Sequence, residues 1–587
     1  MRCYEVGPGV TQAASIHAYE RKDGDPICRP LRIYTVDPSL PRADGAIATL
    51  QVPYEPLKPG PKGCLFEVDC SDGDTQFPPL DLESPRILIG NGLSPGVANP
   101  AFHQQMVYAV ASSTYAIFRS ALGRLVAWGA DTPQPPGLGP RKLILHPHSA
   151  SEGANACYRA SSCEIFFGYA PSKKLPGGTV FACLSHDIIV HEVTHALIHG
   201  LRSRFTIPSN TDVLGFHEGL SDLIAVLHHF LYPEVLATQI RKVGPNVEHS
   251  ELLTQIAAEF GLSVSGPAAV RNAADGKEQT RYNANLEPHA MGNVLVAAVF
   301  EAFIRIFQRK TERFRRLAGP QTPGFWSEDL VQLLAEKAAK LARNFLEIFI
   351  RAIDYCPPLD LSLGDYLRAI ITADYNLVPS DPWSYRETIV DCFAARGILP
   401  DGVIHLSEDS LLWRSPNRPL PVIRNLSFSA LNFDGDPSKP ASAEEMYRQA
   451  CALGDFITQP HICDEFGLMP ASPPVVDLPF IQSIRTSRRV GPDGQVLFDL
   501  VAEVTQRRVV EDEEGNKSKL FGGSTIIIGP RGEIRYVISK SIRSPARLDL
   551  QLKFQKQSPF WELRDSHFRL TGYALTEVHK AWSRLET

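Results

Sequence analysis

The hydrophobic residues of this chain recur at two spacings, which together predict a mixture of helices and strands. A spacing of three to four residues, typical of a helix with one buried face, marks four segments: 99–122, 185–200, 212–232 and 327–355. Runs rich in β-branched and aromatic residues mark strands at 142–146, 164–169, 496–510 and 525–539, the last with a turn at Pro530-Arg531-Gly532. The pattern therefore predicts an α+β fold.

Three regions of the chain differ in character. Residues 1–95 are rich in Pro and Gly, with short apolar runs such as Leu31 to Val36, and they predict a β-rich N-terminal segment. Residues 96–400 carry most of the predicted helices. Strands return beyond Ile398, so residues 401–587 are predicted to form a separate α+β domain.

The composition excludes several classes of partner. The chain has 587 residues, enough for about three or four domains, and a formal net charge of −6. It has no long run of Lys and Arg, so we expect no nucleic-acid interface. No apolar stretch approaches the roughly 20 residues of a membrane helix, and residues 1–8 lack the apolar core of a signal peptide. We therefore expect no membrane insertion.

The cysteines and the histidines outside the predicted helices give weaker signals. Eleven cysteines, an odd number, are scattered without CxxC pairs, which favours free thiols over a disulfide framework. Free thiols predict a cytoplasmic protein. His146 and His148 share one face of a predicted strand, an arrangement more typical of polar surface than of a site.

The strongest chemical signal is the HEVTH motif, His191 to His195, in the second predicted helix. Residues four apart lie on one helix face, so His191 and His195 can present two imidazoles to one ion. Glu192, one residue further on, is placed to take a proton from a metal-activated water. The motif also occurs by chance, and the alternative interpretation is two histidines in a helix core.

A catalytic zinc needs a third protein ligand. The next predicted helix carries Glu218 and Asp222, four residues apart among apolar residues. Two carboxylates in such surroundings need partners, because burying an unpaired charge is costly. A zinc ion for Glu218, and the imidazole N–H of a ligand histidine for Asp222, supply them. The sequence thus predicts a Zn²⁺ site made by His191, His195 and Glu218, with a solvated acidic helix face as the alternative.

These motifs resemble those of the gluzincins, the zinc peptidases of the thermolysin type. In that family HExxH is followed by a Glu in a motif similar to Asn-Glu-Ala-x-Ser-Asp. Glu218 and Ser221-Asp222 match that motif, whereas His217 and Gly219 depart from it. The resemblance covers residues 96–400 and implies a thermolysin-like zincin core, with a β-rich upper lobe and a mainly helical lower lobe. The whole chain is most similar to large, non-secreted members of the family.

The resemblance carries three further positions over to this chain. Asp187 matches a family position at the start of the HExxH helix, where it would support the metal ligands from behind. Asn155 and Ala156 match an edge-strand segment that binds the substrate backbone.

His289, at the start of an apolar helix, matches the histidine that stabilises the transition state in this family. The usual acidic partner of that histidine lies five residues earlier, where this chain has Ala284. Glu287 is the possible substitute.

The resemblance implies a zinc metalloendopeptidase that acts on a peptide or protein. Glu192 would be the general base, and His289 would hydrogen-bond the oxyanion of the tetrahedral intermediate. Two alternatives stay open: a zinc hydrolase that attacks a non-peptide electrophile such as an epoxide, and a non-catalytic interaction protein on a gluzincin scaffold. The intact Glu192 argues against the scaffold, which would not need that carboxylate.

Overall fold

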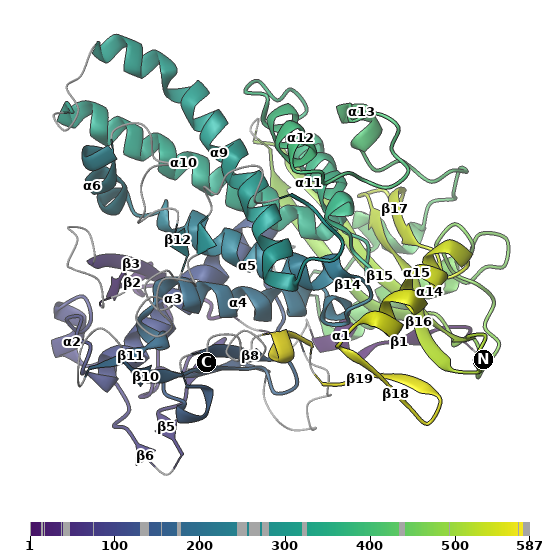
Figure 1. The fold of residues 1–587 in the computed structure, drawn as a ribbon, viewed down its shortest axis with the longest axis horizontal. Coiled ribbons are helices and arrows are strands. Elements are labelled where there is room, and N and C mark those ends of the chain that lie inside the picture. Colours follow the sequence, from purple (N-terminus) through teal and green to yellow (C-terminus); the bar gives the residue numbers. More distant parts are fainter. Residues whose placement is uncertain are drawn as a thin grey trace.

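The fold mixes helices and strands, as the sequence predicts, with the longest helices gathered at one side and the longest strands at the other (Figure 1). It was obtained as a computed structural model. The described residues are 2–12, 16, 18–36, 38, 47–73, 75–129, 140–153, 155–172, 178–243, 255–256, 271–272, 281–319, 326–433, 441–491, 494–572 and 574–578.

The N-terminal part contains short strands, in keeping with its composition. β2 (Cys28–Tyr34) and β3 (Ile47–Pro53) form an antiparallel hairpin. The inward-facing side chains of this hairpin join the main hydrophobic core together with helix α3 (Pro100–Leu122). The smaller elements are β5 (Ser71–Asp72), β6 (Thr75–Gln76) and α2 (Pro85–Ile89).

A four-stranded sheet follows, in the order β4 (Phe66–Val68), β7 (Leu143–His146), β9 (Glu164–Phe167) and β8 (Ala156–Arg159). The strands predicted at 142–146 and 164–169 are confirmed as β7 and β9. β8 is the edge strand and runs antiparallel to β9. A two-stranded sheet of β10 (Tyr169–Pro171) and β11 (Thr179–Phe181) then leads through a 3₁₀ turn, η3 (Ala182–Leu184), into the HExxH helix.

The helices that surround the core match the hydrophobic pattern closely. They are α3, α4 (His186–Leu201), α5 (Thr211–His229), α6 (Pro233–Val243), α9 (Pro288–Ala318), α10 (Glu328–Ala352), α11 (Leu363–Leu377) and α12 (Tyr385–Ala395). All four predicted helices are confirmed, and the one predicted at 212–232 ends slightly early because Pro233 opens α6 instead. A two-stranded pair, β12 (Gln255–Ile256) and β13 (Arg271–Asn272), lies between α6 and α9 in the sequence.

Side-chain caps fix where the central helices begin. Asn99 accepts a hydrogen bond from the backbone N–H of Ala101 at the start of α3, and Asn210 accepts one from Val213 at the start of α5. Gly123 ends α3 with φ 64°, a left-handed conformation that glycine adopts without strain. These signals are local, which is why the sequence predicts these boundaries well.

The C-terminal part is built on a seven-stranded sheet. Its path is β1 (Glu5–Val6), β14 (Phe480–Val490), β15 (Val496–Glu511), β16 (Lys517–Ile528), β19 (His567–Leu570) and β18 (Trp561–Arg564), with β17 (Ile534–Lys540) paired to β16. The helices of this part are α13 (Glu408–Leu411), α14 (Ala443–Ile457) and α15 (Pro545–Gln557).

The C-terminal sheet joins to both other regions. At the N-terminal end, β1 pairs with β14, and α1 (Pro8–Gln12) follows it, so residues 5–12 lie on the C-terminal sheet and not with the rest of 1–95. At the other side, the fully buried Arg202, just after α4, lies 3.3 Å from Glu503 and donates a hydrogen bond to Thr525. The region predicted as a separate domain therefore packs directly on the end of the HExxH helix.

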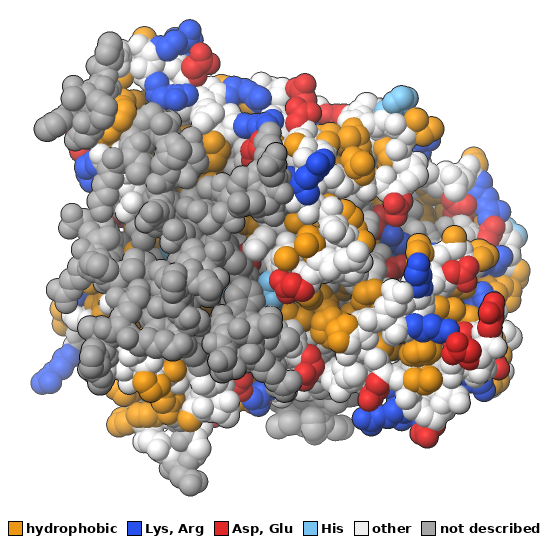
Figure 2. Space-filling model, viewed as in Figure 1, with side chains coloured by type: hydrophobic (Ala, Val, Ile, Leu, Met, Phe, Trp, Pro, Cys, Tyr) orange, Lys and Arg blue, Asp and Glu red, His pale blue; other side chains and the backbone are white. Residues whose placement is uncertain are grey.

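One described helix, α9, is long and apolar enough to cross a membrane by length and composition alone. The bent pair of α5 and α6 is also long and apolar enough if the two helices are taken as one span. In α9, 78% of the 18-residue apolar stretch is buried inside the structure, which is typical of a core helix. Figure 2 shows Lys and Arg side chains interspersed with Asp and Glu over the described part of the face in view.

A close contact between two glycines sets the distance between α5 and α9. A Cβ placed on Gly292 would lie 2.7 Å from the backbone nitrogen of Gly219 and 3.1 Å from the Cβ of Glu218. Two helices can approach this closely only where neither carries a side chain at the crossing. The contact therefore holds the first turn of α9 against the part of α5 that carries Glu218.

We expect Gly292→Ala to lower the free energy of unfolding by about 1–3 kcal/mol, because the added methyl group meets backbone that cannot move aside. Chemical denaturation measures the change. Gly96→Ala is the control, since its Cβ would lie 3.6 Å from the Cβ of Asn99, an ordinary contact. Equal stability of the two variants would contradict the close α5–α9 contact.

Candidate metal centre

The HExxH helix brings two imidazoles together. His191 and His195 lie one turn apart on α4, both buried, and their Nε2 atoms are 2.9 Å apart. Apolar residues of α4, including Val190, Val193 and Leu197, pack into the main core and fix the helix in place. The paired imidazoles predicted from the spacing are therefore present.

Helix α5 adds a carboxylate to this pair. Glu218 is fully buried, with Oε2 3.4 Å from His191 Nε2 and Oε1 3.6 Å from His195 Nε2. Zinc–ligand bonds of about 2.1 Å in tetrahedral geometry put ligand atoms roughly 3.4 Å apart. Nitrogen and carboxylate oxygen are donors that suit a transition-metal ion. These three buried side chains can hold a metal ion.

Asp222 supports the first ligand. Its Oδ1 lies 2.7 Å from His191 Nδ1, so the ring turns its Nε2 toward the other ligands. Burial lowers the pKa of His191, but the Asp222 and Glu218 carboxylates outweigh it and raise the pKa to about 10. The carboxylate–histidine pair predicted for Asp222 is thus formed with His191.

His217 and Ser221 lie on the far side of the second ligand. His217 Nδ1 and Ser221 Oγ are each 3.2 Å from His195 Nδ1. In the resemblance to the gluzincins, His217 is only a departure from the family motif. His217 lies four residues before Ser221, and this spacing predicts that the two side chains share one face of α5.

The side chain of Glu192 extends from α4 to the edge strand β8. Its carboxylate is buried, and Oε2 accepts a hydrogen bond of 2.8 Å from the backbone N–H of Tyr158 in β8. The sequence places Glu192 on the helix but gives no sign of this contact with the strand. The hydrogen bond ties the Glu192 carboxylate to the edge strand.

His289 approaches the same carboxylate from the first turn of α9. Its Nε2 lies 3.2 Å from Glu218 Oε2, and its Nδ1 lies 3.3 Å from Glu287 Oε2. Glu287 also accepts hydrogen bonds from the backbone N–H groups of His289 and Ala290, which caps α9. Burial raises the pKa of Glu287, but His289 and these N–H groups lower it below its usual range. Glu287 is therefore an acidic partner of His289.

Asp187 contacts two histidines at the start of α4 and the end of α5. It hydrogen-bonds His229 of α5 and lies 3.4 Å from His186 Nδ1. Burial raises the pKa of Asp187, but the facing histidines lower it well below its usual value. The three side chains form another group of possible metal ligands, in which both histidines are buried and Asp187 is half-buried.

Asn155 and Ala156 lie at the beginning of β8. Ala156 is buried and pairs with Phe167 of β9, while the Asn155 carbonyl accepts a hydrogen bond from Gly168. Both residues are therefore at the sheet edge that the resemblance implies, on the strand that contacts Glu192.

A C-terminal segment, residues 574–578, touches two of the elements that make the site. Ala574, Leu575 and Val578 form a small apolar cluster with Leu214, which lies one turn before Glu218 on α5. Thr576 Oγ1 lies 3.9 Å from the Sγ of Cys157 in β8. This segment thus bridges α5 and the edge strand.

Comparisons with known proteins do not identify the chain, since no protein-family model matches it and no curated protein matches it.

We expect Asp222→Asn to weaken zinc binding at His191 by about 10–100-fold, because the amide orients the imidazole less firmly and adds no charge. A competition titration with a chelating dye measures the affinity. Asp354→Asn is the control: Asp354 is equally buried but pairs with Arg124. Unchanged affinity in Asp222→Asn would remove this carboxylate from the metal centre.

Proposed function

We propose that this protein is a zinc-dependent peptidase with a thermolysin-like core. The observation that carries the proposal is the convergence of His191, His195 and Glu218, with Glu192 on the same helix as the two histidines and hydrogen-bonded to the edge strand. Two imidazoles and one carboxylate are the ligand set of the gluzincin type.

The donor set fits zinc. Two imidazole nitrogens, with His191 giving up its proton when the ion binds, and one carboxylate form the three-ligand arrangement of catalytic zinc sites, which keeps a further position open. A bound Zn²⁺ supplies Lewis-acid chemistry: it activates a water molecule and polarises the electrophilic carbonyl. Asp222 holds His191 in the orientation that coordination needs.

Glu192 is the proton carrier in this proposal. Its carboxylate accepts the proton of the attacking water and delivers it to the leaving amine. The Tyr158 N–H engages Oε2, which fixes the carboxylate while Oε1 takes the proton. Its position one residue after a ligand keeps it close to the reacting atoms.

His289 faces the centre from α9 and donates a hydrogen bond to the developing oxyanion. Glu287 at its Nδ1 fixes the orientation of the ring. β8 would take the peptide as an added strand at Asn155 and Ala156, since edge strands bind extended chains through backbone hydrogen bonds. These roles make a peptide or protein the substrate class.

The thiols support a cytoplasmic location for this activity. All eleven cysteines are free, and most of them are buried. Such an arrangement suits a reducing compartment.

We expect Glu192→Gln to retain zinc but to lower peptide turnover by at least about 10²-fold, because the amide cannot accept a proton. The near-isosteric amide keeps an oxygen for the Tyr158 N–H, so the fold is preserved. Turnover of a quenched-fluorescence peptide library, with metal analysis, tests this. Glu164→Gln in β9 is the control. Equal turnover in Glu192→Gln and the native chain would remove Glu192 from the mechanism, and no turnover in the native chain would favour the non-catalytic scaffold.

We also expect residues 574–578 to restrict access to the site, because they bridge α5 and β8. Leu575→Asp should release this segment and raise kcat/KM on short peptides by roughly tenfold. This factor corresponds to the free energy of one buried Leu contact that the substitution removes. Leu550→Asp, on the exposed face of α15, is the control and should change little. Lower or unchanged kcat/KM in Leu575→Asp would rule out this role for the segment.

A further inference from the structure

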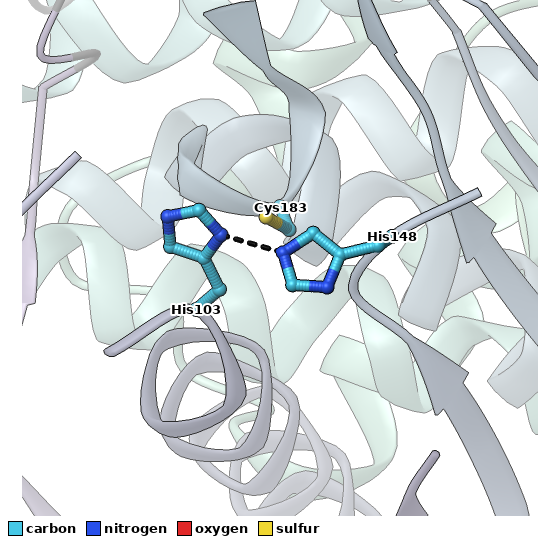
Figure 3. Close-up of side chains that lie close together, drawn as sticks. All are labelled: His103, His148 and Cys183. Atoms are coloured by element: carbon cyan, nitrogen blue, oxygen red, sulfur yellow. Dashed lines mark hydrogen bonds between the residues drawn. The ribbon is translucent and has the colours of Figure 1, made fainter. Parts of the chain in front are cut away.

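A further group of possible metal ligands lies where α3, the end of β7 and η3 meet, apart from the site described above. It consists of His103 from α3, His148 just after β7, and Cys183 in the 3₁₀ turn η3 (Figure 3). All three side chains are buried, and their ligand atoms lie within 4.8 Å of one another. The position of His148 corrects the expectation that it belongs to a polar surface.

The two imidazoles meet through nitrogen atoms, as those of the HExxH pair do. His103 Nδ1 lies 2.8 Å from His148 Nε2, against 2.9 Å between the Nε2 atoms of His191 and His195. Figure 3 shows the two rings turned toward each other, with the sulfur of Cys183 beside them. A single ion can therefore reach both nitrogens and the sulfur.

The tautomer of His103 is fixed for coordination. Its Nε2 lies 2.9 Å from the carbonyl oxygen of Val97, and a carbonyl only accepts hydrogen bonds. The proton therefore sits on Nε2, and the Nδ1 lone pair points at His148. Carbonyl partners of this kind orient metal-binding histidines in many proteins.

The surroundings exclude hard cations and bulk water. The donors are two nitrogens and one sulfur, with no carboxylate among them. Phe77 packs on His148 with ring centroids 4.6 Å apart, and Phe181 packs on His103 at 4.7 Å. Thiolate and imidazole together favour zinc over calcium or magnesium, which prefer oxygen.

We propose that His103, His148 and Cys183 form a second zinc site that links three elements of the fold. Binding releases the thiol proton of Cys183 to solvent, and the thiolate and the two neutral imidazoles coordinate the ion. The site joins α3, the end of β7 and the turn that precedes α4. Cys183 lies eight residues before His191, so the ion would anchor the beginning of the HExxH helix to the β-rich part.

Cobalt substitution separates this site from the proposed catalytic one. A thiolate bound to Co²⁺ gives an intense near-ultraviolet charge-transfer absorption, whereas nitrogen and carboxylate ligands do not. The metal-free native chain, titrated with Co²⁺, should take up one ion at this site and one at the HExxH site, and should show this absorption. Cys183→Ser should lose the absorption and one ion. Cys392→Ser, equally buried on α12, should keep both.

A His191→Ala, His195→Ala double variant should lose the other ion and keep the charge-transfer absorption, so the outcomes for the two sites are distinguishable. His148→Gln serves as a second ligand variant if Cys183→Ser does not fold, which far-ultraviolet circular dichroism decides. Absence of the absorption in the native chain, or its persistence in folded Cys183→Ser, would overturn the proposal. Uptake of Cu⁺ but neither Co²⁺ nor Zn²⁺ would overturn the choice of zinc.

Discussion

The buried carboxylate of Glu218 is the constraint on which the rest of the site depends. It has no exposed surface and faces the imidazoles of His191 and His195. An uncompensated buried carboxylate costs several kcal/mol, so positive charge must lie beside it. The Asp222 and Glu218 carboxylates raise the pKa of His191, and a divalent cation bound there would supply the same positive charge.

The packing of the molecule serves to hold that carboxylate in place. α4 contributes the histidines, α5 contributes Glu218, and the glycine contact at Gly219 and Gly292 brings α9 close enough for His289 to reach the same carboxylate. The C-terminal sheet supports the end of α4 through Arg202. The C-terminal sheet therefore contacts the core that carries the site, while most of its own apolar residues form a separate cluster.

The sequence predicts what is local and misses what depends on long-range packing. Helix periodicity, caps and the i, i+4 spacings locate α4, α5, His191, His195, Glu218 and Asp222, because those relations are set within one or two turns. The hydrogen bond from Tyr158 to Glu192 joins residues 34 positions apart, and no spacing rule anticipates it. His103, His148 and Cys183 meet only because α3, β7 and η3 pack together. The Asp187 contact with His229 is also tertiary, so sequence spacing does not predict it.

Anomalous diffraction at the zinc absorption edge, from crystals of the protein grown in zinc, tests the central claim most directly. The account predicts a peak about 2.0–2.2 Å from His191 Nε2, His195 Nε2 and a Glu218 carboxylate oxygen. A density map with these three side chains in place and no anomalous peak among them would contradict it.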